Sequence, residues 1–174
     1  MGEDWNDYAT TWDEGGPVVY ADAAAASLHQ QTAAFGLTLA GARVLDFGCG
    51  TGLLSQRLAP TVDHIVALDP SEGMIRGLQA KIDAGLTSID AVHGILDEDM
   101  LQTPAFARPF DLVVASSVCA FLDDYPGMVG RLASLLKPGG AFVQWDWEWR
   151  DEDKEPFGLT RQTIHDALQN AGLT

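Results

Sequence analysis

Strand-like and helix-like segments alternate along this chain from about residue 20 onward, which limits the possible folds more than any other feature. RVLDF (43–47) and HIVALD (64–69) are short apolar runs, as expected of strands buried on both faces. Strands that alternate with helices favour a doubly wound α/β fold, in which helices cover both faces of a mostly parallel sheet. The expected strands are 43–47, 64–69, 89–93, 110–117 and 140–147, and the expected helices are 21–35, 52–59, 71–84, 125–136 and 160–172.

The turn after the first expected strand is rich in glycine. VLDFGCGTG (44–52) places Gly48, Gly50 and Gly52 where strand gives way to helix. Glycine tolerates positive φ and lets a ligand approach the backbone, and the following helix offers unpaired N–H groups. Ligands of open α/β sheets bind beyond the carboxyl ends of the strands. A tight turn without a ligand is the alternative.

Three residues around this loop indicate which ligand it would hold. Leu53 stands where the dinucleotide fingerprint G-x-G-x-x-G needs its third glycine. Asp46 would repel a pyrophosphate but suits a cationic amine. Asp69 ends the second strand, where an acid can bind both hydroxyls of a ribose. An adenosine joined to a cationic amino acid meets these conditions, and S-adenosylmethionine is such a molecule.

The chain resembles the class I S-adenosylmethionine-dependent methyltransferases of the small-molecule type. The motifs VLDFGCGTG, ALDPSEGMI, FDLVVASSVCAFL and LLKPGGAFV follow in the family's order over roughly residues 40–146. The resemblance implies that the loop backbone holds the methionine part, that Asp69 holds the ribose and that Met74 borders the adenine. The cofactor-binding residues expected on this basis are Asp46, Gly48, Cys49, Gly50, Asp69, Pro70, Met74, Asp97 and Ser116.

The segment after the third strand departs from the family pattern. Many relatives carry an acid there that meets the adenine amino group, whereas here Ile95 and Leu96 follow Gly94 directly. Either Asp97 or backbone atoms take that role. His93 is expected to end the strand beside the pocket rather than to act as a base.

The segment WNDYATTWDEGG (5–16) resembles the aromatic and acidic lid of small-molecule methyltransferases. In such a lid, which lies over the cofactor, Tyr8 and Trp12 would share one face of a helix and are candidate substrate contacts. The alternative is a tail whose aromatic rings cover the domain's own core.

Two segments bear on the methyl acceptor. SSVCAFLDD (116–124) lacks the proline–aromatic motif of methyltransferases that act on nucleobases and protein amides. Ser116, Ser117 and Cys119 could border the methyl group, or serve as caps and packing residues.

The run QWDWEWR (144–150) spaces three tryptophans two residues apart. The indoles either cover a bare sheet edge, or Trp147 with Asp146 and Glu148 forms an aromatic and acidic wall. Such a wall would suit a cationic or flat aromatic acceptor.

Composition and charge limit the classes of binding partner and the cellular location that we expect. The net charge of −15, with 25 acids and 10 scattered bases, disfavours nucleic acid and anionic membranes. No apolar run reaches the roughly 20 residues of a membrane span, and the acidic N-terminus is unlike a signal peptide. Cys49 and Cys119 have no zinc spacing and are expected to stay reduced. We expect a cytoplasmic protein with a small-molecule partner and no metal.

These observations predict one domain over residues 1–174, with an N-terminal lid and helical segment (1–40), a core (41–150) and a C-terminal helix (151–174). The expected function is methyl transfer to a small molecule by in-line displacement; the alternative is a non-catalytic module that binds the cofactor. Leu53 and Asp46 disfavour a nicotinamide-dependent dehydrogenase. The chain ends at AGLT, directly after the last expected helix, so we expect the family's C-terminal strand pair to be absent from it. We therefore expect five parallel strands with an open edge, and a homodimer or a truncated chain.

Overall fold

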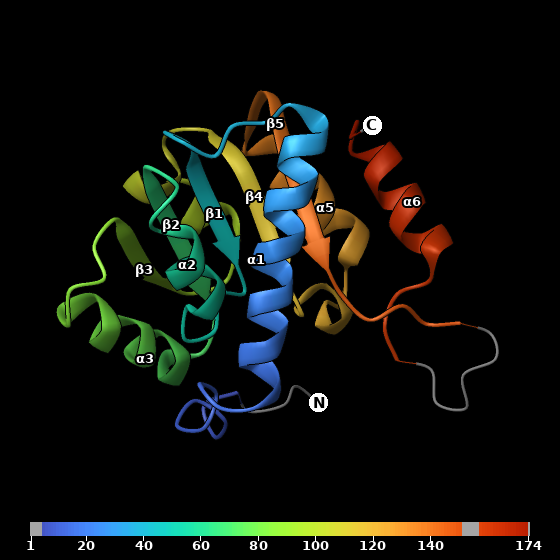
Figure 1. Cartoon of the computed structure of the whole chain (residues 1–174). Helices are drawn as coiled ribbons and strands as arrows, with labels where there is room; N and C mark the ends of the chain where they lie inside the picture. The colour runs from blue at the N-terminus through green and yellow to red at the C-terminus, as the bar shows by residue number, and fades with distance from the viewer. Residues whose placement is uncertain (1–4, 151–156, 174) are drawn as a thin grey trace.

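The protein folds around a five-stranded parallel sheet in the order β3-β2-β1-β4-β5 (Figure 1). The computed structural model describes residues 5–150 and 157–173, so residues 1–4, 151–156 and 174 of the predicted domain lie outside the described residues. The sheet confirms the predicted doubly wound fold and its five parallel strands. The strands are β1 (Arg43–Phe47), β2 (His64–Asp69), β3 (Ile89–His93), β4 (Phe110–Ser116) and β5 (Leu136–Trp145).

The helices follow the prediction except at the start of α1 and in three short turns. Helix α1 begins earlier than expected, because Pro17 fits the first turn of a helix. The turns α4, η1 and η2 were not predicted, since elements of three or four residues carry no periodic pattern. The helices are α1 (Gly16–Phe35), α2 (Leu53–Leu58), α3 (Glu72–Asp83), α4 (Glu98–Leu101), α5 (Tyr125–Ser134) and α6 (Arg161–Asn170), with the 3-10 turns η1 (Pro104–Phe106) and η2 (Cys119–Phe121).

Hydrophobic cores lie on both faces of the sheet. Adjacent residues of β1 point to opposite faces, as in any strand. Val44 packs with residues of α1 and α2 in one core, and Leu45 packs with residues of α5 and α6 in the other. The helices on both faces of the sheet (Figure 1) therefore bury most residues of its central strands.

The chain changes direction across the sheet between β1 and β4. From β1 it moves outward through β2 to β3, and it then returns to place β4 on the other side of β1. This neighbouring pair forms a topological switch point, where loops leave in opposite directions and open a crevice at the carboxyl ends. The glycine loop after β1 and the turn after β4 lie at this point.

Strand β5 is the last strand of the sheet on one side. Beyond Trp145 the chain stays extended, and Leu159 exchanges backbone hydrogen bonds with Trp147 and Trp149. Helix α6 then packs against α5. None of the described helices is both long and apolar enough to cross a bilayer.

Candidate active site

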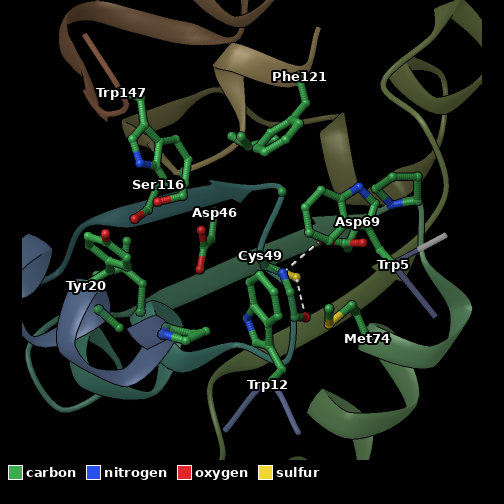
Figure 2. Close-up of a pocket in the computed structure, with 18 residues that line it drawn as sticks. Trp5, Trp12, Tyr20, Asp46, Cys49, Asp69, Met74, Ser116, Phe121 and Trp147 are labelled. Carbon is green, nitrogen blue, oxygen red and sulfur yellow. Dashed lines mark hydrogen bonds between the residues drawn. The ribbon is translucent and has the colours of Figure 1, made fainter. Parts of the chain in front are cut away.

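A cavity of about 240 Å³ opens at the carboxyl ends of β1 and β4 (Figure 2). It lies at the switch point, where the sequence predicts a ligand. Tyr8 and Asp97 were predicted as site residues but do not line it, and the same holds for the candidates Cys119, Asp146 and Glu148. The predicted site residues that do line it are Trp12, Asp46, Gly48, Cys49, Gly50, Asp69, Pro70, Met74, Ser116 and Trp147.

The glycine loop is held against β2 by its own backbone. The N–H groups of Gly48 and Cys49 donate to the carbonyl oxygen of Leu68 at 2.9 and 3.1 Å. Gly50 has a φ of 55°, and a Cβ atom at this position would lie 2.9 Å from Nε1 of Trp12. Glycine is therefore needed here both for the backbone conformation and for the close approach of Trp12.

Asp46 is a buried carboxylate in the cavity wall, with 1% of its surface exposed. Its Oδ2 accepts a hydrogen bond of 2.6 Å from the hydroxyl of Ser55. Burial raises the pKa of Asp46 to about 6, against the lowering effect of Ser55 and with a further rise from Asp69. No Lys, Arg or His is among the described residues that line the cavity. A cationic group of a ligand would therefore stabilise the charged form of Asp46.

Asp69 organises the loop and also faces the cavity. Its Oδ1 accepts from the N–H of Ser71 at 2.8 Å, and its Oδ2 accepts from the N–H of Gly50 at 2.9 Å. Burial raises the pKa of Asp69, and these backbone hydrogen bonds oppose the rise. Each carboxylate oxygen can accept a second hydrogen bond, so Asp69 can still bind hydroxyl groups of a ligand.

Residues 5–15, which we call the N-terminal cover, lie over the cavity and carry Trp5 and Trp12 into its wall. Oδ1 of Asn6 accepts from the N–H of Gly73 at 2.7 Å, at the start of α3. Asp13 forms an ion pair of 2.7 Å with Lys81. The cover thus has two polar attachments to α3, and Tyr8 packs on Trp5 outside the cavity.

The turn after β4 supplies the next part of the wall. Ser116 and Ser117 both line the cavity, and Ser117 has a positive φ of 59°. Such a conformation is uncommon for a residue with a side chain and is often found at functional sites. Cys119 lies fully buried behind this turn and does not line the cavity. Both cysteines are free and buried.

Aromatic side chains from four segments enclose the outer part of the cavity, and we call Trp5, Tyr20, Phe121 and Trp147 the aromatic wall. Their ring centroids lie 5.0 Å apart for Trp5 and Phe121, and 6.0 Å apart for Phe121 and Trp147 and for Tyr20 and Trp147. The planes of these pairs meet at 84°, 83° and 70°. In Figure 2 the labelled rings surround the carboxylate of Asp46.

The acidic half of the predicted wall is not formed, because the acids beside Trp147 face away from the cavity. Oδ2 of Asp146 accepts from the N–H of Cys119 at 2.6 Å. Glu148 forms ion pairs with Arg161 and Arg150 on the surface, and the hydrogen bond from Arg161 is the main reason why its pKa falls to about 2. These two carboxylates are thus bound to backbone N–H groups and to arginines, and neither lines the cavity.

The three tryptophans of QWDWEWR have separate roles. Trp145 packs against the core on the α1 side and donates from Nε1 to the hydroxyl of Ser27 at 3.1 Å. Trp147 lines the cavity. The backbone N–H of Trp149 donates to Leu159, and its side chain does not line the cavity. Of the two predicted roles, Trp145 has the structural one, packing against the core, and Trp147 lies in the wall of the cavity.

Asp97, predicted to meet the adenine, and His93, predicted to end its strand beside the pocket, both have structural partners. Asp97 caps α4, because its Oδ1 accepts from the N–H of Met100 at 2.8 Å, and it lies outside the cavity lining. Nε2 of His93 lies 3.1 Å from the carbonyl oxygen of Pro70, as expected of a strand-end residue. Met74 is buried and lines the cavity.

Sequence reasoning missed three of the four rings of the aromatic wall. Trp5, Tyr20 and Phe121 are far apart in the sequence and meet only in the fold. Trp5 belongs to the segment predicted as a lid, which was a usable signal. Tyr20 and Phe121 showed no pattern that separated them from packing residues.

A family described as "Methyltransferase domain" matches residues 20–174, which include most of the cavity lining. The chain belongs to this family. The family predicted from the sequence motifs is therefore confirmed.

Curated relatives of this methyltransferase domain include ubiquinone biosynthesis O-methyltransferases. That of Bradyrhizobium sp. (strain ORS 278) is 35% identical over 105 residues, which cover 60% of this chain and 40% of the relative. That of Methylobacterium sp. (strain 4-46) is 30% identical over 145 residues, covering 77% of this chain and 57% of the relative. The chain thus spans roughly half the length of the curated relatives it matches.

Solved structures show the same fold at low sequence identity. A SAM-dependent methyltransferase from Aquifex aeolicus has a TM-score of 0.73 at 20% identity, over 96% of this chain and 87% of that one. Magnesium protoporphyrin IX methyltransferase from Synechocystis PCC 6803, solved with bound SAM, has a TM-score of 0.69 at 21% identity, over 99% of this chain and 87% of that one.

Proposed function

We propose that this methyltransferase domain binds S-adenosylmethionine and transfers its methyl group to a small-molecule acceptor by in-line displacement. The observation that carries the proposal is the meeting of the glycine loop, Asp46 and Asp69 in one cavity at the switch point of the sheet. The names of the curated relatives, which are O-methyltransferases, support the same chemistry.

The cavity residues fit the cofactor. Asp46 is a buried carboxylate with a raised pKa and no cationic side chain beside it in the described cavity, so it suits the amino group. Asp69 has acceptor capacity left for ribose hydroxyls. The backbone of Gly48 and Gly50 would meet the methionine part, while Met74 and Pro70 would border the adenine. Asp97 remains a prediction for the adenine amino group, with backbone atoms as the alternative.

The chain contributes to the reaction by positioning the acceptor against the methyl group and by excluding water. When bound, S-adenosylmethionine supplies an electrophilic methyl group. Holding the acceptor in line with it can lower the barrier by on the order of 7–11 kcal/mol. Trp5 and Trp12 cover the cavity and limit access of water, and Ser116 and Ser117 line it at the end of β4. The domain needs no further reactive group if the acceptor reaches the cavity with a free lone pair.

A non-catalytic module that binds the cofactor is the alternative function. It would keep Asp46, Asp69 and the glycine loop but would not turn over. The test is formation of S-adenosylhomocysteine in the presence of a panel of small hydroxyl and amine acceptors. Acceptor-dependent product formation that is lost in Asp69→Ala supports the enzyme. Tight cofactor binding with no turnover on any acceptor supports the module.

The wider setting of the domain also belongs to this proposal. We place it in the cytoplasm as a single domain over residues 1–174, and we expect it to act on a small molecule rather than on nucleic acid or at a membrane. The net charge of −15 supports the exclusion of polyanionic partners.

A further inference from the structure

We infer that the aromatic wall binds an uncharged, flat aromatic group of the methyl acceptor, whose polar substituent meets the hydroxyls of Ser116 and Ser117. This inference rests on the proposed function, because it assigns the cofactor and the acceptor to different parts of one cavity. It separates two acceptor classes, cationic and flat aromatic, that the sequence leaves open.

The first step concerns charge. Asp46 and Asp69 are the only charged side chains among the described residues that line the cavity, and both are assigned to the cofactor. Asp146 and Glu148 would have recognised a cation, but they are bound to backbone N–H groups and to arginines. The acceptor side of the cavity therefore has no carboxylate of its own.

The second step concerns the cofactor, which is itself a cation. A second positive charge in the same cavity would be repelled by it and would also lose its water shell without a paired carboxylate. A cation over an aromatic face gains roughly 0.5–2 kcal/mol, whereas burying an ion without a paired charge costs several kcal/mol. An uncharged acceptor meets neither cost.

The third step concerns the rings. Trp5, Phe121 and Trp147 already pack edge to face, at centroid distances of 5.0 and 6.0 Å. A guest ring can join such an arrangement at roughly 4.5–7 Å, since aromatic pairs prefer edge-to-face or offset contacts. Phe121 and Tyr20 remain 39% and 53% exposed, so the wall has apolar surface that a guest would bury.

The fourth step concerns the hydroxyls. Ser116 and Ser117 line the cavity, and no hydrogen bond joins the hydroxyl of either to another described residue. The positive φ of Ser117 fixes this turn in an uncommon conformation. Each serine can donate to or accept from a polar substituent on the guest ring.

The test is a titration, monitored by ligand-observed NMR, of the protein's complex with sinefungin, an S-adenosylmethionine analogue whose amine keeps the positive charge of the sulfonium; three small probes are added in turn. The probes are phenol, cyclohexanol and the tetramethylammonium ion. We expect phenol to bind most tightly, because only phenol is both aromatic and uncharged. The variants Trp147→Ala and Phe121→Ala should each weaken phenol binding by about fivefold or more. Phe121 is partly exposed, so its variant serves if Trp147→Ala fails to fold.

Trp149→Ala is the matched control, because it removes an indole of the same sequence run that lies outside the cavity lining. It should leave phenol binding unchanged. If tetramethylammonium or cyclohexanol binds as tightly as phenol, or if both wall variants bind phenol normally, the acceptor class is wrong. If neither sinefungin nor S-adenosylhomocysteine binds to the folded protein, the proposed function fails and the inference fails with it.

Discussion

At the scale of single residues, Asp46 and Asp69 show what the sequence can predict. Asp46 is the last residue but one of β1, and Asp69 ends β2. Their positions relative to the glycine loop predict that both line one site, and both line the cavity. The hydrogen bonds that these two carboxylates accept within the protein could not be predicted. The hydroxyl of Ser55 and the N–H groups of Gly50 and Ser71 reach these carboxylates only in the folded chain.

Asp46→Asn should stabilise the protein at pH 8. The folded-state pKa of about 6 lies above the usual 3.8, so the protonated form favours folding below pH 4, and this contribution is lost as pH rises through 6. The amide avoids burying a charge and should gain up to roughly 3 kcal/mol at pH 8, less at pH 5. Urea unfolding at both pH values measures the difference.

Asp111→Asn is the control for that experiment, because its pKa shift has the opposite sign. Burial raises the pKa of Asp111, but the hydrogen bonds from the N–H of Arg43 and the ammonium of Lys137 lower it by more, so the net shift is downward. Its variant should lose stability at pH 8. If Asp46→Asn is also less stable than the wild type at pH 8, the burial argument for Asp46 is wrong.

Asp46→Asn should also weaken the binding of S-adenosylhomocysteine. Wild-type affinity for S-adenosylhomocysteine should rise between pH 5 and pH 7, as Asp46 loses its proton. Asp46→Asn should bind about tenfold or more weakly at pH 7, since hydrogen bonds to charged groups contribute roughly 1.5–3 kcal/mol. Calorimetry at both pH values measures this, and a variant that keeps the full pH dependence would remove Asp46 from the site.

At the scale of elements, the sequence predicts strands better than it predicts the turns between them. The strands β1, β2 and β4 are visible because burial on both faces demands nearly continuous apolar runs. Strand β5 is only half-buried and begins at Leu136 rather than at residue 140, because the residues LKPGG at its start carry no strand pattern. The turn η2 is different, because its position depends on Asp146, a residue from another strand connection. The aromatic wall has the same origin, since it joins the N-terminal cover, α1, η2 and the segment after β5.

Asp146→Ala should loosen the turn at η2. It leaves the N–H of Cys119 without its acceptor, which should lower the free energy of unfolding by roughly 1–3 kcal/mol. The neighbouring Glu148→Gln changes a surface ion pair and should have little effect. Urea unfolding and near-ultraviolet circular dichroism of the wall check the pair, and equal effects would contradict the assigned role of Asp146.

Asn6→Ala should weaken the attachment of the N-terminal cover. Asn6 accepts from Gly73 at 2.7 Å at the start of α3, and its loss should let the cover open more often. Stopped-flow measurement should then show S-adenosylhomocysteine leaving several-fold faster. An unchanged dissociation rate would mean that residues 5–15 do not control access to the cavity.

At the scale of the whole molecule, β5 is the outermost strand on one side of the sheet among residues 5–150 and 157–173, and the homodimer stays a prediction. Exposed strand edges can pair with another chain, although Lys137 and Pro138 at the start of β5 discourage pairing there. We expect a dimer in sedimentation velocity at high protein concentration. A monomer at every concentration would show that the edge is not used.

The central claim is that one cavity at the switch point holds S-adenosylmethionine, and calorimetric titration of the folded protein with S-adenosylhomocysteine tests it most directly. We predict binding at a single site that is weakened at least tenfold in Asp69→Ala, with no binding of NAD, because Leu53 and Asp46 do not suit a pyrophosphate. Absence of binding to the folded wild type, or preference for NAD, would contradict the account.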